Sequence, residues 1–521
     1  MNQALSDFFN KINEIFDVIR IVSDYIWAFP TQYTWYASIP IIGELAMPIV
    51  ILFGVGIYFT IRTKFIALLS FKRSVGIILS KQPSKTGVSA LSAFMLGLAM
   101  RIGPGNIVGV TGAIAVGGPG ALFWMWVAAF FGMTTAFMEA VLAQIFKEKK
   151  NEEFVGGLPF YGKRLLGNMR WVGVCLSVAF IIYALFNIPA QTFNVFSAID
   201  QITKNTTGVT YEKQSFFSYS VALILILSSA ILIFGGIRRV IKYVNILVPF
   251  KATLFFIVSI YLVITNITLI PYFFEVVIKE AFSPSAIFGG SVGVAIAQGV
   301  KRGLMSNEAG QGTITMAAAI ADNRHPCEQG FVQSFGVFVD TMVICTLTGF
   351  IVIFAHLWET PDATYWDAIK DQRIEMYLES VKALTSEHLE HFIKILIAVC
   401  YGLFAFTTLL GMISFAEISA NYISKKDSFI LFIRILGACV FVPFGVITVL
   451  ADLRLSNLWN ITDLTNLMMV YLNIPILLLG APLVYQALKH YLENEKNKQL
   501  QFDSDNVLGV KTEYWTSIPK N

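Results

Sequence analysis

The stretch GLAMRIGPGNIVG, residues 97–109, decides the fold. It lies inside an apolar run long enough to cross a membrane, yet it carries four glycines around Pro104. Proline removes a backbone donor and clashes with the preceding helical turn, while glycine frees the backbone to unwind. Irregular backbone at membrane depth persists only inside protein or around a cavity. The stretch therefore predicts a membrane helix that is broken near its middle.

A second apolar run, five spans later, contains the glycine-rich sequence FGGSVG at 288–293. Paired interruptions in two halves are typical of transporters built from inverted repeats. Pro249 and Pro475, within the fifth span of each half, support the same five-plus-five repeat. Unwound carbonyls favour a cation and half-helix N-termini favour a carboxylate, so we expect a site for a small zwitterion and a coupling ion. The alternative is that these glycines only permit close helix packing.

The composition excludes most other classes of protein. Of 521 residues, 56% are hydrophobic and 14% are charged, where soluble domains carry about 25% charged residues. A net charge of +4 without a basic aromatic run gives no indication of nucleic-acid binding. Five isolated cysteines form no CxxC motif, and no HExxH or GxSxG motif is present, so neither a cofactor nor an enzyme is expected. A channel remains a remote alternative.

Eleven spans of about 20 apolar residues are predicted. They lie near 40–61, 88–115, 120–146, 172–198, 215–235, 243–266, 285–303, 329–356, 392–421, 429–451 and 460–489. The predicted organisation is an amphipathic extracytoplasmic surface helix (1–37), an extra transmembrane helix (38–62), a first inverted repeat of five helices (88–268), a second (284–489) and a cytoplasmic tail (490–521). The first helix has an alternative interpretation as a soluble helix docked on the bundle.

Loop charge predicts the orientation. The segments 62–87 and 147–170 each carry six Lys or Arg residues, whereas 357–388 is acidic. With eleven spans, all basic loops fall on the cytoplasmic side, the N-terminus lies outside and the C-terminus inside. We therefore expect a multi-pass protein of the lipid bilayer of a bacterial-type inner membrane.

Several long blocks resemble one family of transporters. They are GIYFTIRTKF (56–65), the run from GPGNIVG to EAVLA (103–143), GVKRGLMSNEAGQG (299–312), FGVFVDT (335–341) and FAFTTLLG (404–411). These blocks resemble the alanine/glycine:cation symporter family, also called sodium:alanine symporters. The resemblance implies an all-α, LeuT-type fold of ten core helices in two inverted repeats, with one extra N-terminal helix. It also implies sodium-driven uptake of a small neutral amino acid such as alanine or glycine.

The resemblance also implies binding residues. Substrate contacts are expected from Gly103, Gly105 and Asn106 in the first broken helix and from Gly289, Gly290 and Ser291 in the second. A sodium site is expected at Thr407 and Thr408. In FNIPAQTFN (186–194), Asn187 and Gln191 lie one helical turn apart and could bind the amino or carboxylate group. Their alternative role is to satisfy the backbone of a neighbouring helix.

Ionisable residues at membrane depth are functional candidates. Lys251 follows Pro249, about 13–14 Å deep in the membrane, and must be neutral, paired or in a wet cavity. In some proton-coupled transporters of similar fold, a lysine on the fifth core helix takes the place of the second sodium. Our hypothesis is that Lys251 does so here, making transport proton-coupled or sodium-independent. The alternative is a snorkelling or carboxylate-paired lysine.

Two further charged residues are coupling candidates. Arg101, three residues before Pro104, could hold a substrate carboxylate or form a gate pair. Asp340 could take part in coupling or only bond backbone groups. Glu139 and Glu417 lie toward the cytoplasmic ends of their spans, where interfacial or loop-paired carboxylates are expected.

Overall fold

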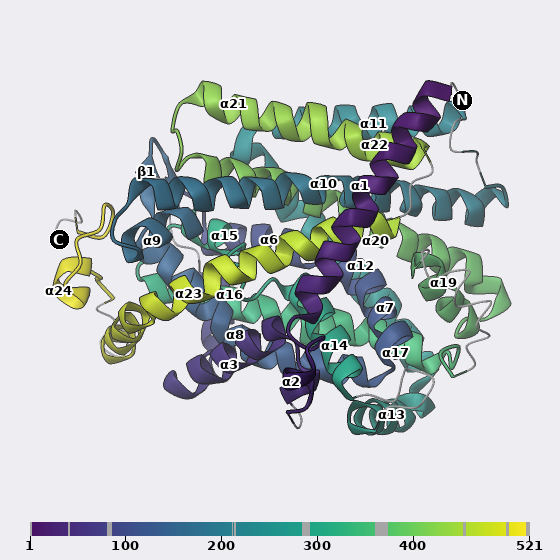
Figure 1. Cartoon of the computed structure of the whole chain (residues 1–521), viewed down its shortest axis with the longest axis horizontal. Coiled ribbons are helices and arrows are strands. Elements are labelled where there is room, and N and C mark those ends of the chain that lie inside the picture. Colours follow the sequence, from purple (N-terminus) through teal and green to yellow (C-terminus); the bar gives the residue numbers. More distant parts are fainter. Residues whose placement is uncertain are drawn as a thin grey trace.

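A computed structural model describes residues 3–39, 42–80, 86–210, 212, 215–283, 292–359, 373–451, 455–495 and 500–516. Helices dominate this part of the chain, and its named strands form one short antiparallel hairpin, β1 (Glu148–Lys150) and β2 (Glu153–Val155). The longest helices run side by side along the horizontal of Figure 1.

Within the described ranges, eight helical spans are long and apolar enough to cross a membrane. Six are α8 (Gly120–Ile145), α10 (Arg170–Thr207), α11 (Phe216–Ile233), α12 (Gly236–Thr265), α20 (Glu387–Ala420) and α23 (Leu455–Glu495). The other two contain a π-helical segment. They are α16–η5–α17 (Pro326–Val337, Phe338–Cys345, Thr346–Phe354) and α21–η6–α22 (Asp427–Ile435, Leu436–Phe441, Val442–Leu450).

A ninth span is the predicted broken helix. It comprises α6 (Ala90–Arg101), the π-helical η2 (Gly105–Gly109) and α7 (Val110–Gly117), bent by 49°. Two more helices, α3 (Met47–Arg62) and α14 (Val292–Asn307), have 16 residues each, short of the roughly 20 that span a bilayer. The fold is therefore confirmed as an all-helical, polytopic membrane protein, while eleven spans and the inverted repeat stay predictions.

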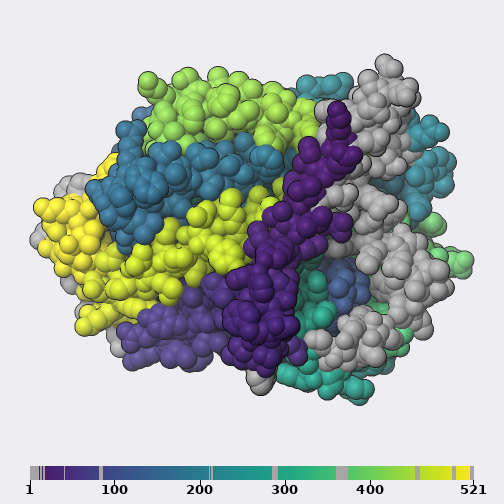
Figure 2. Space-filling view, viewed as in Figure 1, coloured from purple at the N-terminus to yellow at the C-terminus, as the bar shows by residue number. Residues whose placement is uncertain are grey.

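The N-terminal helix α1 (Gln3–Ala28) lies on the surface of the bundle and crosses α23 (Figure 2). The indole Nε1 of Trp27 donates to the backbone carbonyl of Asp463 at 3.1 Å, which fixes the end of α1 on α23. After α2 (Thr34–Ala37) and η1 (Ile42–Glu44) the chain enters α3. This docking favours the interpretation that the first helix packs on the bundle.

Short elements gather at the two ends of the bundle. Figure 1 places α13 (Ile270–Phe282) and α19 (Arg373–Ala383) at one end, and β1 and α24 (Ser504–Leu508) at the other. The remaining short helices are α4 (Ile66–Leu69), α5 (Phe71–Ile78), α9 (Leu158–Leu165), η3 (Ile267–Leu269) and α15 (Thr315–Ala319). The basic segment that contains the hairpin thus lies at the same end as the C-terminal tail.

Small residues let the central helices approach closely. A Cβ added at Gly402 of α20 would stand 3.0 Å from Cβ of Ala198 on α10, and one at Gly445 of α22 would stand 2.8 Å from Cα of Pro189. The helix α12 continues through Pro249, which brings the fully buried Lys251 against α20 and the break after α6.

Candidate functional site

The first break in a membrane helix follows from its local sequence. Pro104 has no amide hydrogen, and the amide of Gly103 turns back to the carbonyl of Arg101 at 2.8 Å and to Oδ1 of Asn106 at 2.8 Å. The carbonyl of Ile102 therefore points out of the helix and is free to accept from another element.

The side chain that reaches this carbonyl is Lys251. Its Nζ donates to the Ile102 carbonyl at 2.6 Å and to the hydroxyl of Thr407 on α20, and it lies 5.1 Å from the ring centroid of Phe404. Within the part of the chain that the structure describes, no carboxylate lies within ion-pair distance of this Nζ. With the side chain fully buried, Lys251 is thus neither snorkelling nor paired with a described carboxylate.

Thr408 closes the same region from the next position of α20. Its Oγ1 donates to the carbonyl of Ala99 at 3.0 Å and would stand 2.8 Å from a Cβ on Gly103. Only glycine fits at 103 without a shift of α20. The two threonines expected at a sodium site therefore do face the broken helix, and Nζ of Lys251 occupies the position between Thr407 and Ile102.

A second non-helical segment, residues 308–314, follows α14 and precedes α15. Glu308, Gly310 and Gly312 have positive φ angles of 58°, 97° and 74°. In the sequence, SNEAGQG (306–312) lies between the predicted spans 285–303 and 329–356, so its two glycines alone do not indicate a break within a span. Gly289, Gly290 and Ser291, the residues expected to bind substrate there, lie outside the described residues.

A buried carboxylate from α8 holds this second segment. Oε1 of Glu139 accepts from the amides of Gly310 (3.0 Å) and Gly312 (2.8 Å) and from Nδ2 of Asn473 (2.6 Å). Asn473 also donates to the Gly310 carbonyl at 3.0 Å and accepts from the hydroxyl of Tyr161 at 2.5 Å. Glu139 is fully buried and bonds backbone and amide donors, so the expectation of an interfacial or cation-paired carboxylate was wrong.

Arg101 connects the two breaks directly. Its Nε donates to the carbonyl of Asn307 at 2.9 Å and its Nη1 to the carbonyl of Gln333 at 2.8 Å. Its Nη2 is buried and has no hydrogen-bond partner among the described residues. The guanidinium is thus held by two backbone carbonyls, and its Nη2 can donate to a carboxylate of a bound molecule.

Asn106 and Asp340 form a second connection. Nδ2 of Asn106 donates to Oδ1 of Asp340 at 2.6 Å and to Ser306 Oγ at 3.0 Å. Ser306 and Thr341 both donate to Oδ2 of Asp340, at 2.7 and 2.8 Å. Asp340 therefore bonds side chains of the first broken helix and of α14, rather than only backbone groups.

The predicted pair on α10 lies elsewhere. Asn187 donates to the carbonyl of Tyr183 at 2.6 Å and to Thr465 on α23 at 3.0 Å. No hydrogen bond given for the described residues joins Asn187 or Gln191 to either break, and Oδ1 of Asn187 and Oε1 of Gln191 lack partners there. Instead, the hydroxyl of Tyr183 on the same helix donates to Oε1 of Glu308, in the second segment, at 3.4 Å. The sequence alone did not predict this contact.

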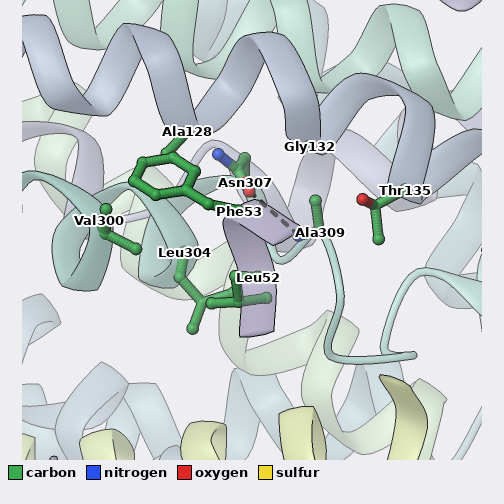
Figure 3. Close-up of a pocket in the computed structure, with 9 residues that line it drawn as sticks. All are labelled: Leu52, Phe53, Ala128, Gly132, Thr135, Val300, Leu304, Asn307 and Ala309. Carbon is green, nitrogen blue, oxygen red and sulfur yellow. Dashed lines mark hydrogen bonds between the residues drawn. The ribbon is translucent and has the colours of Figure 1, made fainter. Parts of the chain in front are cut away.

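A small cavity of about 20 Å³ lies beside the second segment, between α3, α8 and α14 (Figure 3). Its walls are apolar except for Thr135 and Asn307, and Oδ1 of Asn307 already accepts from the amide of Ala309 at 3.0 Å. A zwitterion needs partners for two charged groups, and neither polar side chain that lines this cavity carries a charge.

The fold and this site define a polytopic membrane transporter in which the broken helix α6–η2–α7 and the end of α14, directly before the non-helical segment 308–314, meet through buried polar groups. The chain belongs to the sodium:alanine symporter family, whose sequence model matches residues 34–504. This is a family of transporters and not of enzymes.

Three relatives illustrate the range of the family. The chain is 32% identical to the amino-acid carrier protein AlsT of Bacillus subtilis, over 98% of both chains. It is 33% identical to the sodium/alanine symporter AgcS of Methanococcus maripaludis, over 86% of this chain and 95% of the relative. It is 34% identical to the probable sodium/glutamine symporter GlnT of Bacillus subtilis, over 86% and 88%.

Proposed function

We propose that the chain imports a small neutral amino acid, alanine or glycine in type, by alternating access of two inverted five-helix repeats. The names of the relatives AgcS and AlsT support an amino-acid substrate. We place the zwitterion between Gly103, Gly105 and Asn106 on one side and residues 308–314 on the other. Its carboxylate accepts from Nη2 of Arg101, which has no hydrogen-bond partner among the residues that the structure describes.

We further propose that the ammonium of Lys251 takes the place of one coupling sodium ion. The observation that carries this proposal is that Nζ of Lys251 donates hydrogen bonds to the Ile102 carbonyl and to the Thr407 hydroxyl. Carbonyl and hydroxyl oxygens are ligands that suit a hard cation, and an ammonium can replace one there. Amino-acid uptake is then driven by a proton gradient or is independent of ion gradients.

Sodium coupling is the second candidate. It is favoured by the relatives named as sodium symporters, and one relative is named a putative sodium/proton-dependent alanine carrier. In this case sodium binds at another place, or Lys251 withdraws from Thr407 during the cycle.

The test is uptake of radiolabelled alanine into proteoliposomes under separately imposed sodium and proton gradients. We expect uptake in the wild type to follow the proton gradient, or to be insensitive to both, and to fall at least tenfold in Lys251→Met. Lys242→Met is the matched control because Lys242 lies on the same helix and is exposed. Sodium-driven uptake in the wild type would overturn the proposal for Lys251 and leave the second candidate.

A further inference from the structure

The C-terminal tail folds back onto the end of the bundle that carries the hairpin (Figure 1). Its helix α24 is capped by Oδ1 of Asp503, and Ser504 hydrogen-bonds both Thr512 and Thr516 at 2.9 Å. The indole of Trp515 is 1% exposed, and its Nε1 donates to the carbonyl of Gln144 at 2.6 Å. The tail is therefore packed into the protein and is not a solvated extension.

Aromatic rings of the tail enclose a buried ammonium. Lys147 lies two residues after the end of α8, and its Nζ lies 4.0, 4.6 and 5.0 Å from the ring centroids of Phe154, Tyr514 and Trp515. Two of these three rings belong to the tail. The same Nζ donates to the carbonyl of Ala321 at 2.7 Å. Without the tail, Nζ would keep only the ring of Phe154 and the carbonyl of Ala321 of these four contacts, so the tail adds to its stabilisation.

The residues that the tail covers hold the segment after the second break. The amide of Gln144 donates to the carbonyls of Ala318 and Ala321, the latter at 3.0 Å. Phe502 of the tail packs on the ring of His325, at 4.7 Å between centroids. The tail thus contacts three residues that bond or adjoin α15 and the start of α16. They are Gln144, Lys147 and His325.

The tail also reaches the loop between α20 and α21. Nζ of Lys425 lies 2.8 Å from Glu148 of the hairpin and 3.9 Å from Glu513 of the tail. The helix α20 carries Thr407 and Thr408. The tail therefore contacts three places: the end of α8, His325 in the segment after residues 308–314, and the loop after α20, the helix that faces the first break.

We propose that residues 500–516 form an inner clasp, which holds this end of the transporter closed and must release Trp515 before the path opens on this side. The inference goes beyond the proposed amino-acid transport. Only the second of its two tests rests on that function.

The first test measures the reactivity of a native thiol behind the clasp. Cys327 is fully buried, and its amide donates to Nδ1 of His325, the ring that Phe502 covers. Full-length protein in detergent is treated with a maleimide, and labelling is read peptide by peptide by mass spectrometry. We expect Trp515→Ala to label Cys327 at least fivefold faster than wild type. Trp171→Ala, which removes an exposed indole, is the control and should leave the rate unchanged.

A second buried thiol separates unclasping from unfolding. Cys345 lies beside Asn106 at the centre of the bundle, with Sγ 3.3 Å from Nδ2. Its labelling should stay at the wild-type rate in Trp515→Ala. An unchanged rate at Cys327, or a parallel rise at Cys345, would overturn the clasp. If Trp515→Ala cannot be purified, Lys147→Met decides by the same two thiols, with at least a twofold rise expected at Cys327 alone.

The second test locks the clasp reversibly. Glu148 and Glu513 both contact Nζ of Lys425, so the two positions are candidates for a disulfide in Glu148→Cys with Glu513→Cys, and mass spectrometry of the linked peptides verifies that it forms. We expect alanine uptake into proteoliposomes to fall at least tenfold on oxidation and to return with a reductant. Uptake that is equal in the oxidised and reduced protein would overturn the clasp. Absence of uptake in reduced and wild-type protein alike would instead contradict the proposed function, and the thiol test would still decide the clasp.

Discussion

The two breaks differ in what they expose and in what holds them open. At the first, Pro104 and its glycines release a carbonyl, that of Ile102, and a cation from α12 binds it. At the second, residues 308–314 present two amides, those of Gly310 and Gly312, and an anion from α8 binds them. One break therefore arises from its own sequence, whereas the other depends on a carboxylate about 170 positions away.

This comparison also separates the two buried charges by role. Among the hydrogen bonds of the described residues, Lys251 makes one to the first break, and the Ile102 carbonyl can accept it because the local backbone has turned away. Glu139 contacts two amides and, through Asn473, one carbonyl of the second break. Removing Glu139 should therefore disturb the structure, while removing Lys251 should mainly change which cation binds.

The largest effect is expected at Glu139. Glu139→Ala leaves two buried amides without a partner, and we expect a loss of about 3–5 kcal/mol in the free energy of unfolding together with loss of uptake. Glu139→Gln keeps one acceptor oxygen and should lose roughly half as much. Thermal unfolding in detergent, followed by tryptophan fluorescence, measures both.

The control for this prediction is Glu417→Ala. Glu417 pairs with Arg434 at 2.9 and 2.5 Å, as expected for a carboxylate near a span end; it is buried, whereas the side chain of Arg434 is 21% exposed. Because solvent can still reach Arg434 after the change, the loss should be smaller than at Glu139, about 1–2 kcal/mol. A loss at Glu417 that equals or exceeds the loss at Glu139 would show that the carboxylate of α8 does not hold the second break.

A steric pair tests the first break. A Cβ on Gly103 would stand 2.8 Å from Oγ1 of Thr408, so Gly103→Ala should lower the free energy of unfolding by about 1–3 kcal/mol. Adding Thr408→Ala removes the obstacle, and the double variant should recover at least about 1 kcal/mol relative to additivity. Gly54→Ala is the control because a Cβ there meets nothing within 4 Å. Additive losses would contradict the close approach.

The second break should not allow the same rescue. A Cβ on Gly310 would stand 2.7 Å from Leu52, but its φ of 97° also disfavours any side chain. Gly310→Ala should therefore stay destabilised by about 1–3 kcal/mol after Leu52→Ala is added. Rescue here would mean that crowding, and not backbone conformation, requires glycine in the second break.

A smaller effect is expected from the ion that replaces Lys251. In Lys251→Met, the Ile102 carbonyl and the Thr407 hydroxyl are left for another cation. Sodium at ten times its dissociation constant would then stabilise the variant by about 1.4 kcal/mol. We expect the unfolding midpoint of the variant to rise in sodium chloride over choline chloride, while the wild type does not change. A wild type that responds as strongly would contradict the proposed replacement.

Much of the fold and half of the site follow from the sequence, for physical reasons that differ between the two breaks. Proline and glycine act on their own backbone, so the break at Ile102–Gly105 could be predicted, as could the depth of Lys251. The position of Thr407, which Lys251 contacts, near the broken helix could be predicted only through the resemblance to the symporter family. The break at 308–314 was missed because its glycines become interpretable only once Glu139 is known to face them.

The smallest effect concerns the connection behind the second break, where His325 lies between α15 and α16. Burial, with a smaller contribution from neighbouring His490, lowers the pKa of His325 below its ordinary range. The folded protein therefore keeps this imidazole neutral, while the unfolded chain takes up a proton below about pH 6.5. Stability is then full above that pH and falls below it, by at most about 1.4 kcal/mol per pH unit.

Between pH 7.5 and 5.5 we therefore expect the unfolding midpoint to fall less in His325→Gln than in wild type, with the exposed His391→Gln as control. The comparison of the two breaks makes this prediction specific. Acid should speed maleimide labelling of Cys327, beside His325, relative to Cys345, beside Asn106 of the first break. Thiol reactivity itself falls in acid, so the ratio of the two rates is the measure. A constant ratio would mean that the buried imidazole does not make this end sensitive to pH.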